Sequence, residues 1–108
     1  MKHANAYWIA NDLQEVLAPH CQRLAIAGSL RRGKPEVKDI ELVAVPKTKE
    51  IKDLFGIPTS ISELEQFPWS LIGDIEKCGQ RYKKLRLYDG IGLDIFIVLP
   101  PEIGRAHV

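Results

Sequence analysis

Three acidic residues lie in strand-like segments that could bring their carboxylates together. Asp39 and Glu41 are two positions apart in the segment DIELVAV, and Asp94 lies in the later segment GLDIFIV. Side chains two apart in a strand point to the same face of a sheet, so Asp39 and Glu41 should project together. Carboxylates bind Mg²⁺ well, and three of them in one place would repel one another without a cation. We therefore expect Asp39, Glu41 and Asp94 to be catalytic residues that bind Mg²⁺, for which Mn²⁺ can substitute.

A turn suited to phosphate precedes the first two carboxylates, in the run GSLRRGKPEVKDIE that starts at Gly28. Glycine lets the backbone approach a phosphate closely, and a helix N-terminus presents unpaired N–H groups to an anion. Ser29 adds a hydroxyl, and one of the adjacent Arg31 and Arg32 can aim its guanidinium at phosphate oxygens. Beside metal ions, such a turn would hold a triphosphate while one metal activates an attacking hydroxyl and the other steadies the leaving pyrophosphate.

Each of these signals has an ordinary structural explanation when it stands alone. A Gly-Ser pair after a strand is usually a turn, and an Asp-x-Glu pair is usually a solvated strand face. Paired arginines are usually surface charge. Their order and spacing along alternating strands and helices is what favours a site for nucleotidyl transfer.

Short alternating elements are predicted to position these residues. The first half predicts a helix over residues 5–17, a strand over 23–27, a helical turn capped by Ser29 that runs to Gly33, a loop over 34–38 and a strand over 39–45. The second half predicts a helical insert over 47–55, a short helix capped by Ser60 or Ser62, a short strand over 69–72, and a hairpin of strands over 80–88 and 92–99 that turns at Asp89 and Gly90. We expect one domain over residues 1–108 with a loose tail over 100–108. The expected fold class is α/β (α+β), with helices packed on one face of a small, mixed, twisted sheet.

Apolar residues within these elements predict which faces are buried. The apolar stripe of the first helix consists of Ile9, Leu13, Val16 and Leu17. In the first hairpin strand one face consists of Lys83, Leu85 and Leu87, and the opposite face of Tyr82, Lys84, Arg86 and Tyr88. We expect this opposite face to be either a nucleic-acid surface, with Lys84 and Arg86 near phosphates, or an exposed strand face with cross-strand pairs.

The composition is that of an ordinary small cytoplasmic domain. The 108 residues carry a formal net charge of +1, and 45% of them are hydrophobic. This net charge neither indicates nor excludes a nucleic-acid partner, because binding to nucleic acid depends on how charge is distributed over the surface. Cys21 and Cys78 follow no metal-ligand spacing, and we expect them as reduced thiols. No apolar run is long enough to span a bilayer, so we expect a cytoplasmic protein without a membrane partner.

The motif residues resemble those of the nucleotidyltransferase superfamily, and within it the DNA polymerase β-like (family X) palm. That family's pattern is Gly-Ser-x-Arg-Arg-Gly, a short loop, Asp-x-Asp, and a distant Asp on a later strand. The chain matches it over roughly residues 24–99, at Gly28, Ser29, Arg31, Arg32, Gly33, Asp39, Glu41 and Asp94. The resemblance implies the nucleotidyltransferase fold. It also implies a metal-dependent transfer of a nucleoside monophosphate from a (d)NTP to the 3′-hydroxyl of DNA or another nucleic acid.

The resemblance further implies a role for each matched position. Asp39 and Glu41 would bind both metals. Asp94 would bind the catalytic metal and orient or deprotonate the attacking 3′-hydroxyl. Ser29 and Arg32 would hold the β- and γ-phosphates, and the glycine before Ser29 would let the backbone approach them.

Three positions depart from the family pattern. Glu41 replaces the more common Asp and is one methylene longer. Lys38 stands where family X enzymes often have a glycine whose backbone meets the triphosphate, and we include its side chain among the phosphate-binding candidates. Gly92 replaces an arginine found in several relatives, so Lys84 or Arg86 on the neighbouring strand would supply the charge instead.

Two alternatives to a polymerase stay open. Minimal nucleotidyltransferases modify a protein or small-molecule hydroxyl, and the small size and near-neutral charge of this chain favour that reading. The second alternative is a non-catalytic nucleotide- or DNA-binding module with the same fold. It stays open because Lys38 and Gly92 depart from the family pattern. The DNA-gripping and nucleotide-selecting segments that flank the palm in family X are not expected, since residues 5–17 are one helix and only residues 100–108 follow Leu99. We therefore expect a minimal enzyme or a fragment of a longer one.

Overall fold

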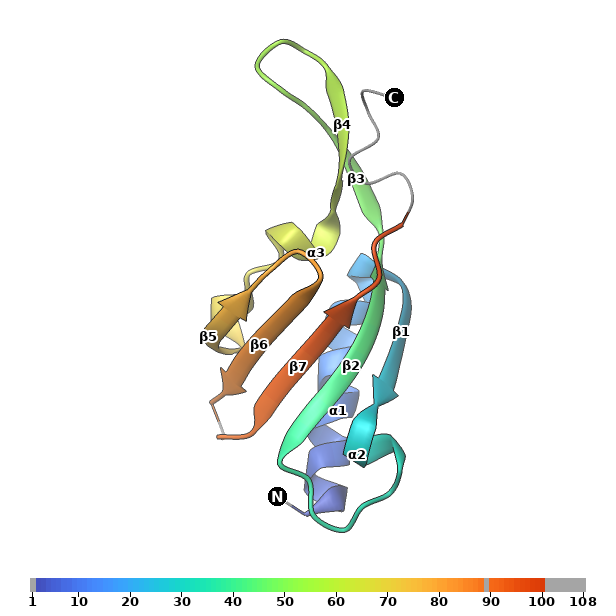
Figure 1. Cartoon of the computed structure of the whole chain (residues 1–108), viewed down its shortest axis with the longest axis vertical. Helices are drawn as coiled ribbons and strands as arrows, with labels where there is room; N and C mark the ends of the chain where they lie inside the picture. Colours follow the sequence, from blue (N-terminus) through green and yellow to red (C-terminus); the bar gives the residue numbers. More distant parts are fainter. Residues whose placement is uncertain (1, 89, 101–108) are drawn as a thin grey trace.

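A five-stranded mixed sheet forms the centre of the computed structural model, which describes residues 2–88 and 90–100. In sheet order the strands are β1 (Cys21–Ala27), β2 (Asp39–Pro46), β7 (Gly92–Ile97), β6 (Tyr82–Leu87) and β5 (Gly73–Cys78). The pair β2–β7 is parallel, and the other three pairs are antiparallel (Figure 1). The chain is therefore a mixed α and β protein with a mixed sheet, as the sequence predicts.

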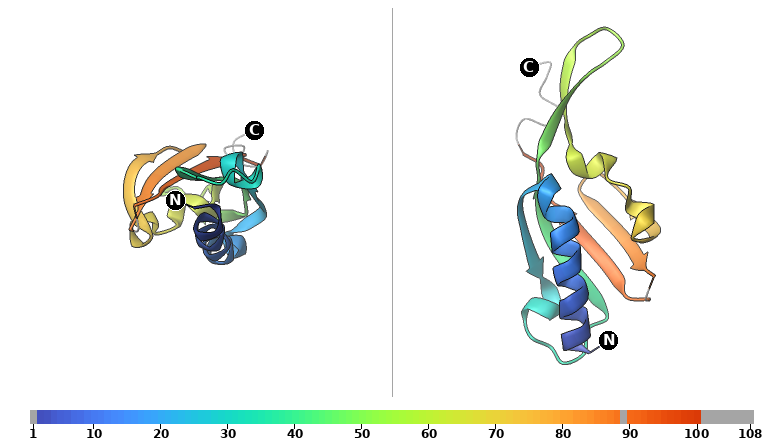
Figure 2. Two further views of the ribbon diagram at one scale, coloured as in Figure 1. Left: turned by 90° about the horizontal axis from the view of Figure 1, so that it is seen from below. Right: turned by 180° about the vertical axis from the view of Figure 1, so that it is seen from behind.

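One long helix and several short helical turns accompany the sheet. The long helix is α1 (His3–Leu17), and the 3₁₀ helix η1 (Ala18–His20) follows it. The short turns are α2 (Gly28–Arg31), α3 (Glu63–Gln66) and the 3₁₀ helix η2 (Trp69–Leu71). Helix α1 lies across one face of the sheet, which Figure 2 shows from behind and from below.

The hydrophobic core lies between α1 and this face of the sheet. The strand residues buried there include Ile40, Leu42, Ala44, Leu85, Leu93 and Ile95. Successive side chains of a strand point to opposite faces, so the residues between these point away from the helix. Asp39, Glu41 and Asp94 belong to that second set and are each half-buried. The helix-free side of the central strands is thus where the predicted carboxylates lie.

The buried stripe of α1 differs from the expected one. The buried helix residues are Ala6, Ala10, Leu13 and Leu17. Val16, which the sequence predicts in the core, is 47% exposed. Alanine side chains are small and let a helix approach a sheet closely. The two alanines lie on the face of α1 that packs against the sheet. Val16 lies to the side, where it lines an apolar cavity together with Ile72.

Residues 47–55, expected to be helical, form a β-hairpin instead. Strand β3 (Thr48–Lys52) pairs antiparallel with β4 (Pro58–Ser62), and the two make a separate two-stranded sheet. This hairpin projects from one end of the main sheet (Figure 1). The helix prediction was therefore wrong for this segment.

The reason lies in the turn of the hairpin. Leu54 and Phe55 are 100% and 86% exposed, so the apolar spacing that indicated a helix has no surface to pack against. Asp53 accepts hydrogen bonds from the backbone N–H groups of Phe55 at 2.8 Å and Ile57 at 3.0 Å. Gly56 then takes a φ of 76°, which reverses the chain.

The segment after the hairpin confirms one prediction and overturns another. Ser62, one of the two proposed caps, accepts a hydrogen bond from the N–H of Leu64 at 3.1 Å and caps α3. Residues 69–72, expected as a strand, form η2 and the residue after it. The strand is β5, which follows directly. Its residues after Gly73 are all exposed, so no buried alternation marks it in the sequence.

The predicted hairpin of the last two strands is confirmed as the antiparallel pair β6–β7. Of the two expected turn residues, Gly90 has a φ of 93°, and Asp89 lies outside the described residues. The tail expected over 100–108 lies outside them too, except for Pro100, which is buried. Within the part of the chain that is described, no helix is both long and apolar enough to cross a membrane.

Lys83 points into the core side of β6, as the alternation predicts. Its side chain is 1% exposed, yet its ammonium donates to the carbonyl of Gly79 at 2.9 Å and to Glu65 at 3.2 Å. The ammonium also lies 5.9 Å from the centre of the Trp69 ring. A buried charge is tolerated where such partners replace water, so Lys83 ties α3 and η2 to the sheet.

Candidate functional site

The three predicted carboxylates lie side by side on β2 and β7. Asp39 is the register partner of Gly92, and Glu41 is the partner of Asp94. On the other side of β2, Glu41 is also opposite Ala27, the residue before the Gly-Ser turn. The pairing of β2 with both neighbours therefore brings the turn and all three carboxylates to one region of the helix-free face.

The carboxylates of Glu41 and Asp39 occupy space that side chains at Gly28 and Gly92 would fill. A β-carbon on Gly28 would lie only 2.5 and 2.6 Å from the carboxylate oxygens of Glu41, and one on Gly92 would collide with Oδ1 of Asp39. Gly28 also has a φ of 66°, a conformation that other residues rarely adopt. Glu41 and Asp39 thus lie directly over glycine backbone.

Asp94 is bonded to the neighbouring strand β6. Its Oδ1 accepts a hydrogen bond of 2.5 Å from the hydroxyl of Tyr82 and one of 3.4 Å from the ammonium of Lys84. The Asp94 side chain is 13% exposed and that of Lys84 is 28% exposed. The hydrogen bond to Asp94, together with burial and the nearby negative charges, raises the pKa of Tyr82 to about 12. Tyr82 therefore stays a protonated donor throughout the neutral range.

A pocket of about 270 Å³ opens beside the β2 carboxylates. Its lining residues are Ser29, Lys34, Glu36, Lys38, Asp39 and Glu41. The set combines a hydroxyl, two ammonium groups and carboxylates, which are the groups that bind a polyphosphate together with a divalent cation. Of the predicted phosphate ligands, Ser29 and Lys38 thus line one pocket with Asp39 and Glu41.

Lys34 is a lining residue that the sequence analysis missed. It follows Gly33 directly, and its backbone N–H donates to the carbonyl of Ser29 at 3.2 Å. This bond folds the chain back so that the lysine lies beside the Gly-Ser turn. The available signal was a third basic residue in the run RRGK, which could have been counted with the two arginines.

Arg32 lies outside the lining of this pocket. It is exposed at the end of α2, and its backbone N–H donates to the carbonyl of Gly28 at 3.1 Å. Ser29 does not cap α2 as expected, because the capping position is Ala27 and no side chain caps the helix. The Ser29 hydroxyl is therefore not used by that helix end and lies in the pocket lining.

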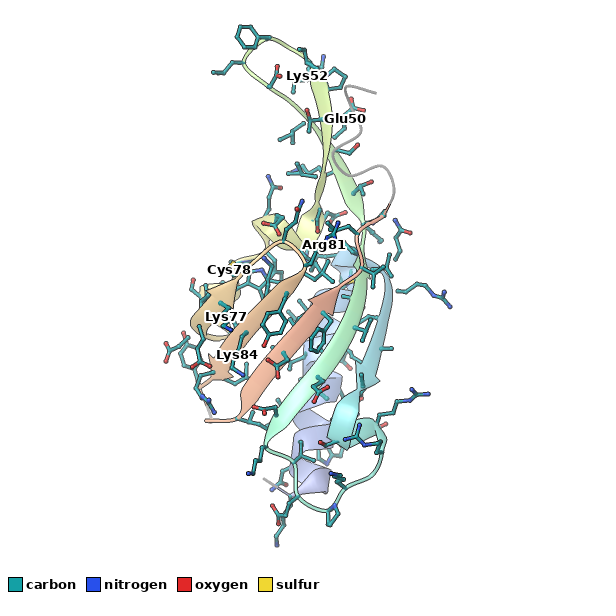
Figure 3. All side chains as sticks on the ribbon, viewed as in Figure 1. Glu50, Lys52, Lys77, Cys78, Arg81 and Lys84 are labelled. Atoms are coloured by element: carbon teal, nitrogen blue, oxygen red, sulfur yellow. The ribbon has the colours of Figure 1, made fainter. Side chains whose placement is uncertain are left out.

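The predicted nucleic-acid contacts lie on the helix-free face of β6. Lys84 pairs with Asp94, and Arg86 donates to the carbonyl of Gly90 at 3.1 Å and lies 3.8 Å from Glu76. Figure 3 shows Lys84 on this side of the sheet. Next to Lys84 and Asp94 along the strands, the rings of the register partners Tyr82 and Phe96 pack with their centres 5.2 Å apart. Tyr88, expected on the same face, lies beyond the end of the strand and donates its hydroxyl to the carbonyl of Ser70.

The donor chemistry of the site suits a hard divalent cation, although its oxygens are spread. Asp39 and Glu41 line the pocket, whereas Oδ1 of Asp94 is engaged by β6. Across the described ranges, no three His, Cys, Asp or Glu side chains converge as a ready group of metal ligands. A metal at this site would draw on Asp39, Glu41 and the second oxygen of Asp94.

The remaining features of chemical interest lie elsewhere. Cys21 and Cys78 are free thiols, as predicted, and burial is the main cause that raises the pKa of Cys21. A larger cavity of about 410 Å³ lies beside α1, lined mainly by apolar residues together with Asp12 and Tyr88. None of its lining residues is a lysine or an arginine, and it shares no residue with the pocket beside Asp39 and Glu41. A comparison of the chain with protein-family models and with curated proteins finds no match.

Proposed function

We propose that this protein is a divalent-metal-dependent nucleotidyltransferase with the nucleotidyltransferase fold, similar to a DNA polymerase β palm. It would transfer a nucleoside monophosphate from a (d)NTP to a nucleic-acid 3′-hydroxyl and release pyrophosphate. The observation that supports this most is the register of β2 with β7, in which Glu41 is opposite Asp94 beside the pocket lined by Ser29 and Lys38.

The pocket residues would bind the triphosphate. Ser29 would donate its hydroxyl, and Lys34 and Lys38 would neutralise the charge of the phosphates from two sides. Lys38 would thereby replace the close backbone approach that glycine gives in family X. Arg32, exposed at the rim of the turn, would reach the phosphates from outside this pocket.

The carboxylates would hold the metal and handle the proton. Asp39, Glu41 and Asp94 would bind Mg²⁺ or Mn²⁺, which when bound polarises the α-phosphate and lowers the pKa of the acceptor hydroxyl. Asp94 would orient that hydroxyl and accept its proton through the oxygen that Tyr82 does not bind. A bond then forms between the acceptor oxygen and the α-phosphorus, and the bond to the β-phosphate oxygen breaks as pyrophosphate leaves.

The acceptor would lie across the helix-free face of β6 and β7. Tyr82 and Phe96 offer ring surfaces there, and Phe96 is 43% exposed. Lys84 and Arg86 supply positive charge next to them. Aromatic rings beside basic side chains are a common way to bind single nucleic-acid strands.

Primer extension tests this proposal. The purified chain is incubated with a labelled primer–template or single-stranded primer, dNTPs or NTPs, and Mg²⁺ or Mn²⁺. Incorporation by the wild type is expected to fall to the enzyme-free level in Asp39→Ala combined with Asp94→Ala. Asp12→Ala, which removes an exposed carboxylate on α1, is the control and should behave as wild type. A wild type that incorporates no more label than the double variant would rule out the polymerase.

A second candidate is the same chemistry on a protein or small-molecule hydroxyl. The observation in its favour is that the two basic side chains on the helix-free face of β6 are already paired, Lys84 with Asp94 and Arg86 with Glu76. This pairing weakens the case for a nucleic-acid surface. Mass spectrometry after incubation with an NTP and candidate acceptors would detect a nucleotidyl adduct. Nucleotide binding without either product would instead indicate a non-catalytic binding module.

A further inference from the structure

Asp94 lies in a row of four charged residues that crosses the sheet from Glu41 on β2 to Lys77 on β5. Its register partner on β2 is Glu41, and its partner on β6 is Lys84. A carboxylate is therefore flanked by a second carboxylate on one side and by an ammonium on the other. Repulsion from Glu41 and attraction to Lys84 act in the same direction, so Asp94 is drawn toward β6.

Both donors from β6 bind the same oxygen of Asp94. Tyr82 donates to Oδ1 at 2.5 Å and Lys84 donates to Oδ1 at 3.4 Å. Among the described residues no hydrogen bond to Oδ2 is present. The carboxyl group is thus held at one oxygen only, and the other oxygen is available to a ligand.

The tyrosine is itself held in place. Its ring packs against Phe96, two positions after Asp94 on the same strand, with the ring centres 5.2 Å apart and the planes inclined by 34°. This contact fixes the direction of the Tyr82 hydroxyl before any ligand arrives. A donor that is already oriented costs little entropy when it restrains a partner.

We propose that Tyr82 and Lys84 are positioning residues for Asp94, which hold it by Oδ1 so that Oδ2 faces the metal and the acceptor hydroxyl. This inference rests on the proposed nucleotidyl transfer. Two side chains from the next strand would thus take the place of the arginine that several family X relatives carry at the position of Gly92. In this chain the Asp39 carboxylate occupies the space of a Gly92 side chain. Lys84 would also act on the metal site through Asp94, with its positive charge opposing the cation.

Two consequences distinguish this role from a purely structural one. Without Lys84 or the Tyr82 hydroxyl, Asp94 gains rotational freedom, so turnover should fall. Without the charge of Lys84, the site repels a divalent cation less, so the affinity for that cation should rise. A variant that merely loosens the fold would lose both turnover and metal affinity.

The variants to test are Tyr82→Phe and Lys84→Met. A hydrogen bond to a charged group contributes about 1.5–3 kcal/mol, so each variant should lower kcat by about ten- to hundredfold. The KM for the nucleotide should change less than about twofold, because neither residue lines the pocket of Ser29 and Lys38. Lys84→Arg, which keeps the charge, should recover part of the turnover.

Direct binding of Mn²⁺, followed by electron paramagnetic resonance without nucleotide, provides the second readout. Lys84→Met should bind Mn²⁺ several-fold more tightly than wild type. The matched controls are Tyr88→Phe, which loses a hydroxyl bonded to the Ser70 carbonyl, and Lys52→Met on the projecting hairpin (Figure 3). Both controls should match the wild type in Mn²⁺ affinity and in turnover.

The outcomes separate this inference from the proposed function. Equal Mn²⁺ affinity in Lys84→Met and wild type would overturn the inference, whether or not the protein turns over nucleotide. An active wild type whose kcat is unchanged by both variants would overturn it as well. A wild type without transferase activity would instead count against the proposed function, and the Mn²⁺ measurement would still decide the role of Lys84.

Discussion

The carboxylate of Asp39 occupies the space in which a β-carbon on Gly92 would lie. The two residues are register partners across the parallel pair β2–β7. The Asp39 side chain on β2 therefore fits because Gly92 on β7 has no side chain. Glu41 has the same relationship with Gly28 on its opposite side. The positions of both β2 carboxylates are therefore set by glycines on neighbouring segments.

Gly92→Ala should displace the Asp39 carboxylate. The added methyl group overlaps Oδ1 of Asp39, which is the end of a rotatable side chain, so the carboxylate should turn away at a small cost in stability. We expect nucleotide transfer to fall at least about tenfold, while the free energy of unfolding in urea changes by less than about 1 kcal/mol. Gly79→Ala, whose β-carbon would lie 3.2 Å from the backbone carbonyl of Tyr82 and meets neither carboxylate of β2, is the control and should keep more of the transfer. Unchanged transfer in Gly92→Ala would contradict the prediction.

Gly28→Ala should be more damaging than Gly33→Ala. Both glycines have positive φ, 66° and 75°, so the two variants share the backbone strain of about 1–2 kcal/mol. Only at Gly28 would the new methyl group also meet Glu41, whereas nothing lies within 4 Å of the one at Gly33. Chemical denaturation of both variants measures the difference. Equal losses of stability would show that Glu41 moves away without cost.

Lys38→Met should weaken nucleotide binding while turnover at saturation changes less. A charge-assisted hydrogen bond to phosphate is worth about 1.5–3 kcal/mol, so the KM for the nucleotide should rise by about tenfold or more. Lys49→Met, on β3 of the projecting hairpin, is the matched control, because its ammonium bonds the side chain of Gln66 on α3. A KM that moves equally in both variants would mean that Lys38 does not touch the triphosphate.

Asp94→Asn should lower the pKa of Tyr82. In the wild type the bond to the Asp94 carboxylate is the main cause that raises this pKa from 10.0 to about 12. The folded protein then holds the phenol proton more tightly than the unfolded chain does. The associated stability is present below pH 10 and is lost as the pH rises toward 12. Alkaline titration by tyrosine carbon-13 NMR would show the shift, with Asp12→Asn on α1 as the control that leaves the Tyr82 signal unchanged.

The two thiols should differ in reactivity. Cys21 is 7% exposed, and burial together with the charge of Glu63 raises the pKa of its thiol, which Lys47 offsets in part. Cys78 is exposed. Alkylation with iodoacetamide at pH 8, followed by mass spectrometry, should label Cys78 at least about tenfold faster in the folded protein, because Cys21 must wait for local opening. The difference should vanish in denaturant, and equal labelling without denaturant would contradict the burial of Cys21.

The elements around the site were predictable because several sequence signals agree there. Residues 23–27 are short and mostly apolar and end before Gly28, whereas residues 39–45 are rich in β-branched residues. Both segments lie in strands, β1 and β2. The period of two in residues 80–88 also predicted that Lys83, Leu85 and Leu87 share one face of β6, and this face is the buried one. Where buried and exposed positions alternate along a strand, apolar and polar residues alternate in the sequence, and the strand can be predicted.

The remaining elements depend on contacts that local pattern does not encode. Leu54 and Phe55 have helical spacing, but the chain exposes both at the tip of a hairpin. The edge strand β5 carries no buried residue after Gly73, so nothing in its sequence marks it. Within the site, the bond from Tyr82 to Asp94 depends on the register of β6 with β7, which spacing along one strand cannot give.

The parallel pairing of β2 with β7 also has a consequence for how the protein folds. Each half of the site belongs to a local antiparallel pair, Glu41 to β1–β2 and Asp94 to β6–β7. About half of the chain separates these halves, and closing so long a loop is slow because its entropy is lost before the contacts form. We therefore expect the two hairpins to form early and to dock late. In that order of events, the chain acquires its candidate active site in the last step of folding, and catalysis would report that folding is complete.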